Sequence, residues 1–119
     1  MFVNRELLEA KCACEDQLNL FNELFPKGVE LTRELILEHA RKFDWDWYAK
    51  NLLSDQGFKT YWLATKPSQE AYIIATKPAR EAYYPDIGPA REAYKLATKQ
   101  AREALNIARA TAFADVLGL

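Results

Sequence analysis

Apolar residues recur at three- and four-residue steps through residues 5–25. They are Leu7, Cys14, Leu18, Phe21 and Phe25. This spacing predicts one amphipathic helix over residues 5–25, because residues three and four apart share a helix face. Asn4 is a suitable N-cap, and Glu6 lies near the positive end of the helix. Pro26 and Gly28 predict its end.

Two further short helices are predicted before residue 57. Thr32 is a suitable cap for the first, which fades by Phe43. Asp44 or Asp46 caps the next helix, whose apolar residues follow the helical i, i+3, i+4, i+7, i+8 pattern. Residues 54–57, Ser-Asp-Gln-Gly, mark a break. We therefore expect a three-helix module over residues 1–57.

The second half of the chain is built from rows of eleven residues. The clear rows cover residues 64–74, 75–85, 86–96 and 97–107, with a degenerate row before them and a fading row after them. One column holds the tyrosines, continued by leucine and valine: Tyr61, Tyr72, Tyr83, Tyr94, Leu105 and Val116. An alanine column precedes it. Eleven residues make three helical turns, so each column stays on one side of a helix. The alanine and tyrosine columns therefore predict a packing seam.

Prolines recur with the same period, at Pro67, Pro78 and Pro89. Either one long helix is kinked at each proline, or each row is a short helix with proline in its first turn. Because proline is tolerated in a first turn, we expect short helices for the first two rows. Residues 84–89 predict a break, after which residues 90–116 form one helix that folds back as a helical hairpin. The predicted fold is all-α: the three-helix module of residues 1–57, with the repeat region of residues 58–119 packed on it.

The composition of the chain argues against several classes of protein. The chain has 119 residues, of which 50% are hydrophobic, so it can bury a core. Its net charge is −1, which excludes a strongly basic nucleic-acid binder. The longest apolar runs are about five residues, against the roughly 18 that a membrane-spanning helix needs. The N-terminus lacks a signal-peptide pattern. We therefore expect a cytoplasmic protein with no membrane partner.

No catalytic constellation emerges from the side chains. Cys12, Cys14 and His39 do not complete a four-ligand metal site, so structural thiols are the favoured interpretation. Four glycines form no phosphate loop, and the only serines, Ser54 and Ser68, lie in no nucleophile motif. We expect neither an enzyme nor a bound metal or cofactor.

Aromatic residues are the first candidates for contact with a protein partner. Residues 43–48 contain Trp45, Trp47 and Tyr48 among aspartates, a composition that suits a hot spot for a protein partner. The alternative is that Trp45 and Tyr48 belong to the core while Trp47 covers the join to the repeats. In the tyrosine column, Tyr72, Tyr83 and Tyr94 are covered either by the rest of the chain or by a second copy in a dimer.

Basic residues form a second periodic pattern. The lysines are Lys66, Lys77 and Lys99, and the arginines are Arg80, Arg91 and Arg102. A basic ladder with tyrosines could follow a nucleic-acid backbone. The favoured interpretation is a solvated helix face with i,i+4 ion pairs. Those pairs are Lys66–Glu70, Lys77–Glu81 and Lys99–Glu103. The three arginines remain candidate contacts for a protein partner.

Two motifs resemble a known group of sequences. The stretch of residues 13–32, running on to residues 46–53, resembles a module common in uncharacterised bacteriophage and prophage proteins. The Ala-Arg-Glu-Ala-Tyr rows with a periodic proline are similar to the eleven-residue repeats that often follow that module. The resemblance implies a small protein made during infection, which inhibits a host defence protein such as a CRISPR-Cas component by binding. It carries no active site. The alternatives are a self-associating phage assembly protein and a nucleic-acid-binding protein that uses the basic ladder.

Overall fold

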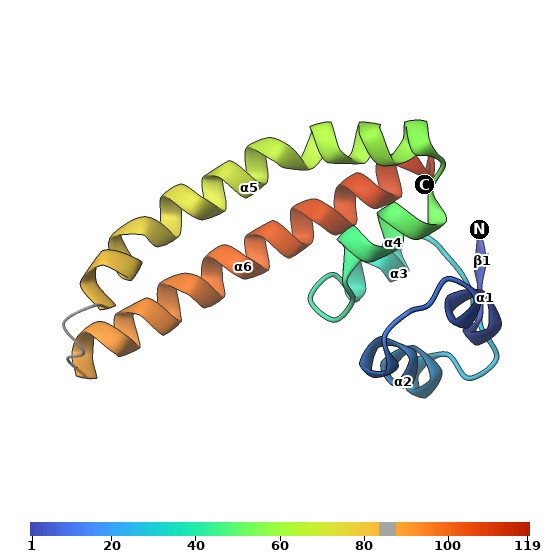
Figure 1. Cartoon of the computed structure of the whole chain (residues 1–119), viewed down its shortest axis with the longest axis horizontal. Helices are drawn as coiled ribbons and strands as arrows, with labels where there is room; N and C mark the ends of the chain where they lie inside the picture. The colour runs from blue at the N-terminus through green and yellow to red at the C-terminus, as the bar shows by residue number, and fades with distance from the viewer. Residues whose placement is uncertain (84–87) are drawn as a thin grey trace.

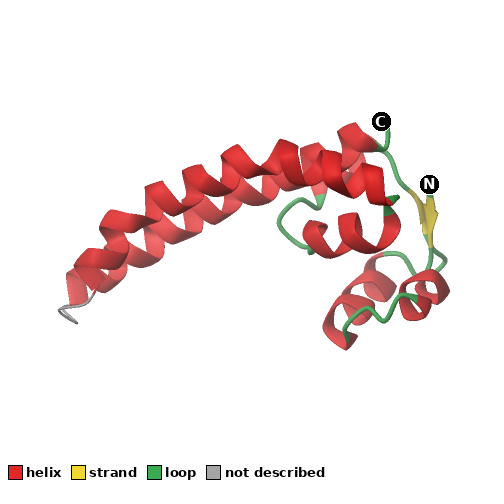
Figure 2. Cartoon of the chain, turned by 45° about the horizontal axis from the view of Figure 1, so that its top comes forward, coloured by secondary structure: helices red, strands yellow, loops and turns green. Residues whose placement is uncertain are grey.

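A long helical hairpin extends from a small helical head (Figures 1 and 2). The computed structural model describes the backbone of residues 1–83 and 88–119 and the side chains of residues 1–77 and 95–119. The elements are β1 (Phe2–Val3), α1 (Arg5–Ala10), α2 (Glu15–Leu24), β2 (Val29–Glu30), α3 (Arg33–Glu38), α4 (Trp45–Leu52), α5 (Asp55–Tyr83) and α6 (Gly88–Val116). The molecule measures 47 × 29 × 25 Å. The all-α prediction is confirmed.

Side-chain caps begin the short helices of the head where the sequence predicts them. Asn4 Oδ1 accepts a hydrogen bond from Leu7 N at 2.8 Å, at the start of α1. Thr32 Oγ1 accepts from Leu35 N at 3.2 Å, and Asp44 Oδ1 accepts from Trp47 N at 3.1 Å. Each cap satisfies one backbone N–H that has no partner within its helix. Of the two aspartates proposed as the third cap, the structure selects Asp44.

The prediction of one helix over residues 5–25 is wrong, because the chain breaks between α1 and α2. Cys12 has a positive φ of 61°. Its N–H donates to Glu9 O at 3.0 Å, and Ala13 N donates to Leu8 O at 3.0 Å. This pair of bonds is a Schellman motif, which ends a helix at a left-handed residue. Glycine is the usual residue there, so a cysteine at this position leaves no obvious sequence signal.

A two-residue strand pair closes the head. Phe2 pairs with Glu30 and Val3 with Val29 in an antiparallel arrangement that the sequence analysis does not predict. Gly28 precedes β2 with a φ of +81°. A Cβ at Gly28 would lie 2.9 Å from the backbone oxygen of Val3 and 2.6 Å from the Phe2 ring. Gly28 therefore permits both the turn and the close approach of the first strand.

We expect Gly28→Ala to lower the free energy of unfolding by about 2 kcal/mol, because it adds backbone strain and a clash with Val3. Gly118→Ala is the matched control, since Gly118 has a similar φ of +76° and a Cβ added there would have nothing within 4 Å. The control isolates the cost of the left-handed conformation, about 1 kcal/mol. Urea unfolding of both variants measures the difference. Equal losses would show that the contact with Val3 is unimportant.

The first two rows do not form separate short helices, so that prediction is wrong. Pro67 and Pro78 both lie within the continuous helix α5. The helix follows a curved path, convex on the side away from α6 (Figure 1). Pro67 is exposed, so water can reach the Leu63 carbonyl that the missing N–H leaves without its helical partner. Packing along the opposite side of α5 keeps the helix continuous.

The predicted hairpin is confirmed. Helix α5 ends at Tyr83 and α6 begins at Gly88, and the two helices pack along one another (Figures 1 and 2). The expected helix over residues 90–116 matches α6 closely. The predicted break covers residues 84–89, of which residues 84–87 lie outside the described part of the chain.

Tyrosine and threonine columns form the seam between α5 and α6. Tyr61, Thr65 and Thr76 are buried on α5, and Leu105 is buried on α6. The threonine hydroxyls donate to backbone oxygens one turn back, at 3.2 Å from Thr65 to Trp62 O and 2.9 Å from Thr76 to Tyr72 O. Where its side chains are described on these helices, the predicted alanine column is not part of the buried seam. Its described members on the two helices, Ala71 and Ala104, are exposed and line a groove of about 230 Å³.

One hydrophobic core joins the head to the near end of the hairpin. Phe113 of α6 is fully buried, and its ring centroid lies 5.4 Å from that of Trp45 and 6.3 Å from that of Tyr48. Arg33 of α3 forms an ion pair with Asp115. The Arg33 Nε also donates to Leu119 O at 2.6 Å. The core therefore contains residues from both predicted segments.

Candidate functional site

The aromatic cluster of residues 43–48 lies mostly inside the head. Trp45 and Tyr48 are buried, which agrees with their interpretation as core residues rather than exposed contacts. The Trp45 Nε1 donates to Ala40 O at 3.2 Å. Trp47 is half-buried, and its ring packs edge-on against Tyr48 with centroids 5.3 Å apart. Trp47 alone of these three presents part of its ring to solvent.

A polar network connects α4 to both long helices. The Tyr61 hydroxyl donates to Asp46 Oδ1 at 2.6 Å, and Arg109 Nη2 lies 3.2 Å from Asp46 Oδ2. Burial raises the pKa of Tyr61 far above its usual value, and the hydrogen bond to Asp46 raises it further. Burial also raises the pKa of Tyr48, with a smaller contribution from the negative charge of Asp44. Both side chains are buried in the core, which indicates a structural role.

The remaining predicted contacts divide between described and undescribed side chains. Tyr72 is half-buried beside the seam, and Arg102 is exposed on α6. The side chains of four predicted residues lie outside the described part of the chain: Tyr83, Tyr94, Arg80 and Arg91. The structure therefore brings together no complete tyrosine or arginine surface among the residues that it describes.

An apolar column that the sequence analysis missed lies on the outside of the hairpin. We name it the outer column; its members are Leu63, Ile74, Leu96 and Ile107. Each is the last residue of a row. Leu63, Ile74 and Ile107 each follow a residue of the tyrosine column by two positions, which is about 200° around a helix. The side chains consequently point away from the seam, and Leu63 is 60% exposed and Ile74 71% exposed.

Trp62 and Ile73 extend the outer column on α5. They are 49% and 48% exposed and directly precede Leu63 and Ile74. This part of α5 therefore presents four large apolar side chains to solvent within thirteen residues. Their eleven-residue spacing was visible in the sequence. Only the placement of the seam, however, reveals which columns face outward.

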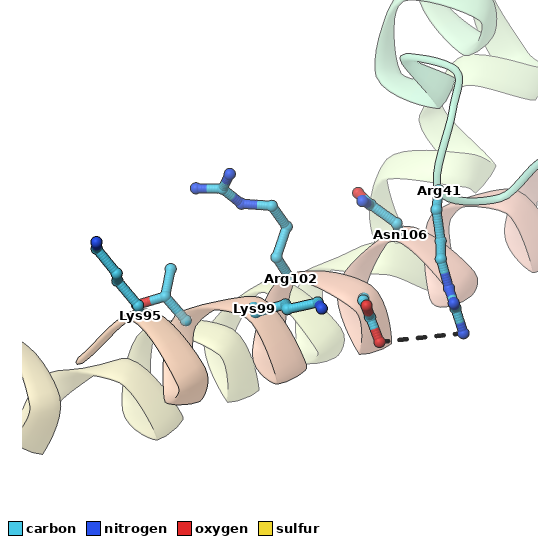
Figure 3. A pocket seen from close by; sticks show the side chains of 7 residues that line it. Arg41, Lys95, Lys99, Arg102 and Asn106 are labelled. Carbon is cyan, nitrogen blue, oxygen red and sulfur yellow. Dashed lines mark ion pairs between the residues drawn. The ribbon is translucent and has the colours of Figure 1, made fainter. Parts of the chain in front are cut away.

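A second surface, which we name the basic groove, lies between α6 and the segment that joins α3 to α4 (Figure 3). The groove has a volume of about 390 Å³. Its lining residues are Arg41, Lys95, Thr98, Lys99, Arg102, Glu103 and Asn106. Arg41 reaches toward α6 from the head, while Lys95, Lys99 and Arg102 follow one another along the helix (Figure 3). Four positive charges thus face one negative charge.

The predicted i,i+4 ion pairs are not present among the described side chains. Neither Lys66–Glu70 nor Lys99–Glu103 lies within ion-pair distance, and the side chain of Glu81, the predicted partner of Lys77, is outside the described residues. Glu103 instead faces Arg41 across the groove at 4.0 Å. The predicted ion pairs of these two lysines are therefore wrong, although both lysines are exposed, as expected for a solvated helix face.

The candidate metal ligands are scattered. Cys12 and Cys14 are exposed and form no disulfide. The His39 ring packs edge-on against Phe25 and Phe43. Within the described residues, no three histidine, cysteine or acidic side chains gather into a metal-binding group. The same part of the chain holds no helix long and apolar enough to span a membrane.

Comparison with known proteins finds no family model, no curated protein and no solved structure that matches the chain.

Proposed function

We propose that this protein acts by binding a macromolecular partner, with no chemistry of its own, through the side of α5 that faces away from α6. The observation that carries the proposal is the outer column. On α5 its members Leu63 and Ile74 lie beside the exposed Trp62, and exposed apolar patches mark protein interaction sites. The contact would occupy a surface of the partner and block it.

Trp62 is the proposed anchor. Tryptophan is enriched among the residues that dominate binding energy, and this one is half exposed beside Leu63. Lys59 and Lys66 lie one turn before and after this pair, and both are exposed. An apolar centre with a charged rim is the usual anatomy of a protein interface. This assignment replaces Trp45 and Tyr48, whose rings are already covered by the chain itself.

The resemblance to bacteriophage and prophage proteins favours a bacterial host protein as the partner. Inhibition of a defence component, such as a CRISPR-Cas protein, needs only a stable complex that covers a functional surface. The hairpin suits that mode, because it projects a long rigid face away from the head (Figure 1).

The test is capture from a nuclease-treated lysate of bacteria with an active CRISPR system, followed by mass spectrometry. We expect one near-stoichiometric host protein, bound roughly 30-fold more weakly by the Leu63→Gln/Ile74→Gln variant, because interface hot spots contribute about 2 kcal/mol or more. Leu37→Gln is the matched control, since Leu37 is also an exposed leucine but lies on α3. Glutamine keeps a helix propensity close to that of leucine.

Self-association would use the same outer column and is distinguished by the mass in solution. If the chain sediments as a dimer or larger species, and the Leu63→Gln/Ile74→Gln variant as a monomer, the column is an assembly surface and the host-protein proposal fails. If the Leu63→Gln/Ile74→Gln variant binds the host protein as strongly as the Leu37→Gln control does, the contact surface lies elsewhere on the molecule.

A further inference from the structure

We propose that the basic groove binds the phosphate backbone of a single nucleic-acid strand. The groove shares no residue with the outer column, so this proposal and the proposed function fail separately. The groove residues are mostly positively charged, include side chains that donate hydrogen bonds, and follow one another along α6.

The positive charges of the groove are largely uncompensated. Lys95, Lys99 and Arg102 have no acidic partner within ion-pair distance among the described side chains. The one acidic residue of the groove, Glu103, faces Arg41 at 4.0 Å. The lining therefore carries a formal charge of +3, from four cations and one carboxylate, on a chain whose net charge is −1. Such a local concentration of charge attracts an anion although the whole molecule does not.

The polar groups around these charges suit phosphate. Asn106 adds a side-chain amide to the lining. Phosphate oxygens are bound by arginine, lysine and asparagine side chains, and this groove supplies all three. Lysine, in contrast, is depleted from protein–protein interfaces. The two lysines in the lining therefore favour a nucleic acid over an acidic protein surface.

Three cations of the groove lie in a row along α6, as successive phosphates lie in a row along a nucleic-acid strand. Lys95, Lys99 and Arg102 span eight residues of α6, and the first and last lie about 10 Å apart along the helix axis. Three cations in that length can contact successive phosphates of one strand. Figure 3 shows these side chains in succession along α6, with Arg41 reaching over from the head farther along the helix. The groove presents one such line, so it fits one strand.

The test measures binding of a fluorescent oligo-deoxythymidine of about 20 nucleotides to the whole chain as a function of salt. With four phosphate contacts, affinity is expected to fall about 50-fold between about 50 and 200 mM salt. Lys95→Gln/Lys99→Gln should weaken binding roughly 10-fold or more at the lower salt concentration and halve the salt slope. Lys66→Gln/Lys77→Gln makes the same change of net charge on α5, where both lysines are exposed and occupy the repeat position of Lys99. This control should change affinity by no more than about twofold.

Circular dichroism confirms that the variants are folded, which is expected because all four lysines are exposed. Three results would overturn the proposal: no binding of the oligonucleotide at low salt, equal weakening by both double variants, or binding of duplex DNA in preference to the single strand. Competition by free nucleotide at the same phosphate concentration would assign the groove to a small phosphate ligand and would also overturn the polymer assignment.

Discussion

Replacing Phe113 with alanine is expected to lower the free energy of unfolding by about 3–5 kcal/mol, the usual cost of truncating a fully buried phenylalanine. The ring packs against Trp45 and Tyr48 and so connects α6 to the head. A small domain is stable by only about 5–15 kcal/mol, so the variant should be close to unfolding at room temperature. Urea unfolding followed by circular dichroism measures the loss.

Ile107→Ala is the control, because Ile107 lies on the same helix but is 43% exposed in the outer column. Its substitution should change the free energy of unfolding by less than about 1 kcal/mol. If Phe113→Ala were as mild as this control, the aromatic cluster would not be the main connection between the head and the hairpin.

Alkaline solution is expected to unfold the protein progressively above about pH 10, the ordinary pKa of tyrosine. Tyr48 and Tyr61 have pKa values raised in the folded state, chiefly by burial, while the unfolded chain releases their protons near pH 10. The unfolded state therefore binds fewer protons than the folded state above that pH. Stability is complete below pH 10 and falls as the pH rises, by about 1.4 kcal/mol per pH unit for each of the two residues.

Urea unfolding at about pH 8, 10 and 11 checks this expectation, with tyrosinate absorbance as a second readout. Tyr61→Phe should remove about half of the pH dependence, because one of the two titrating hydroxyls is gone. That variant leaves Asp46 with its ion pair to Arg109. A folded protein whose six tyrosines all ionise near pH 10 would contradict the burial of these hydroxyls.

The elements that sequence analysis located are those with a local physical cause. Asn4, Thr32 and Asp44 accept hydrogen bonds within three residues of their own position, so their side chains alone indicate helix starts. The Schellman motif at Cys12 involves a residue with no special preference for a positive φ, and the strand pair joins positions distant in sequence. Neither has a local signature.

The surfaces were harder to predict than the helices. An eleven-residue period places each column on one side of a helix but does not state which side is covered. Alanine next to tyrosine suggested the seam, whereas the structure buries threonine hydroxyls that bond back to their own helix. Shifting the seam by a few positions exposes Leu63 and Ile74. Glu103 pairs with Arg41 and not with Lys99, and Arg41 is far away in sequence.

The shared columns of α5 and α6 make the hairpin modular in length. The two antiparallel helices bring like columns to the same face, as in the groove that Ala71 and Ala104 line from opposite helices. Removing or adding one row in each helix would change the reach of the arm by about 16 Å while returning every remaining side chain to its former face. An insertion of ten or twelve residues would instead rotate the distal surface by about 100°. The reach of this protein could therefore vary in steps of one row without redesign of its seam.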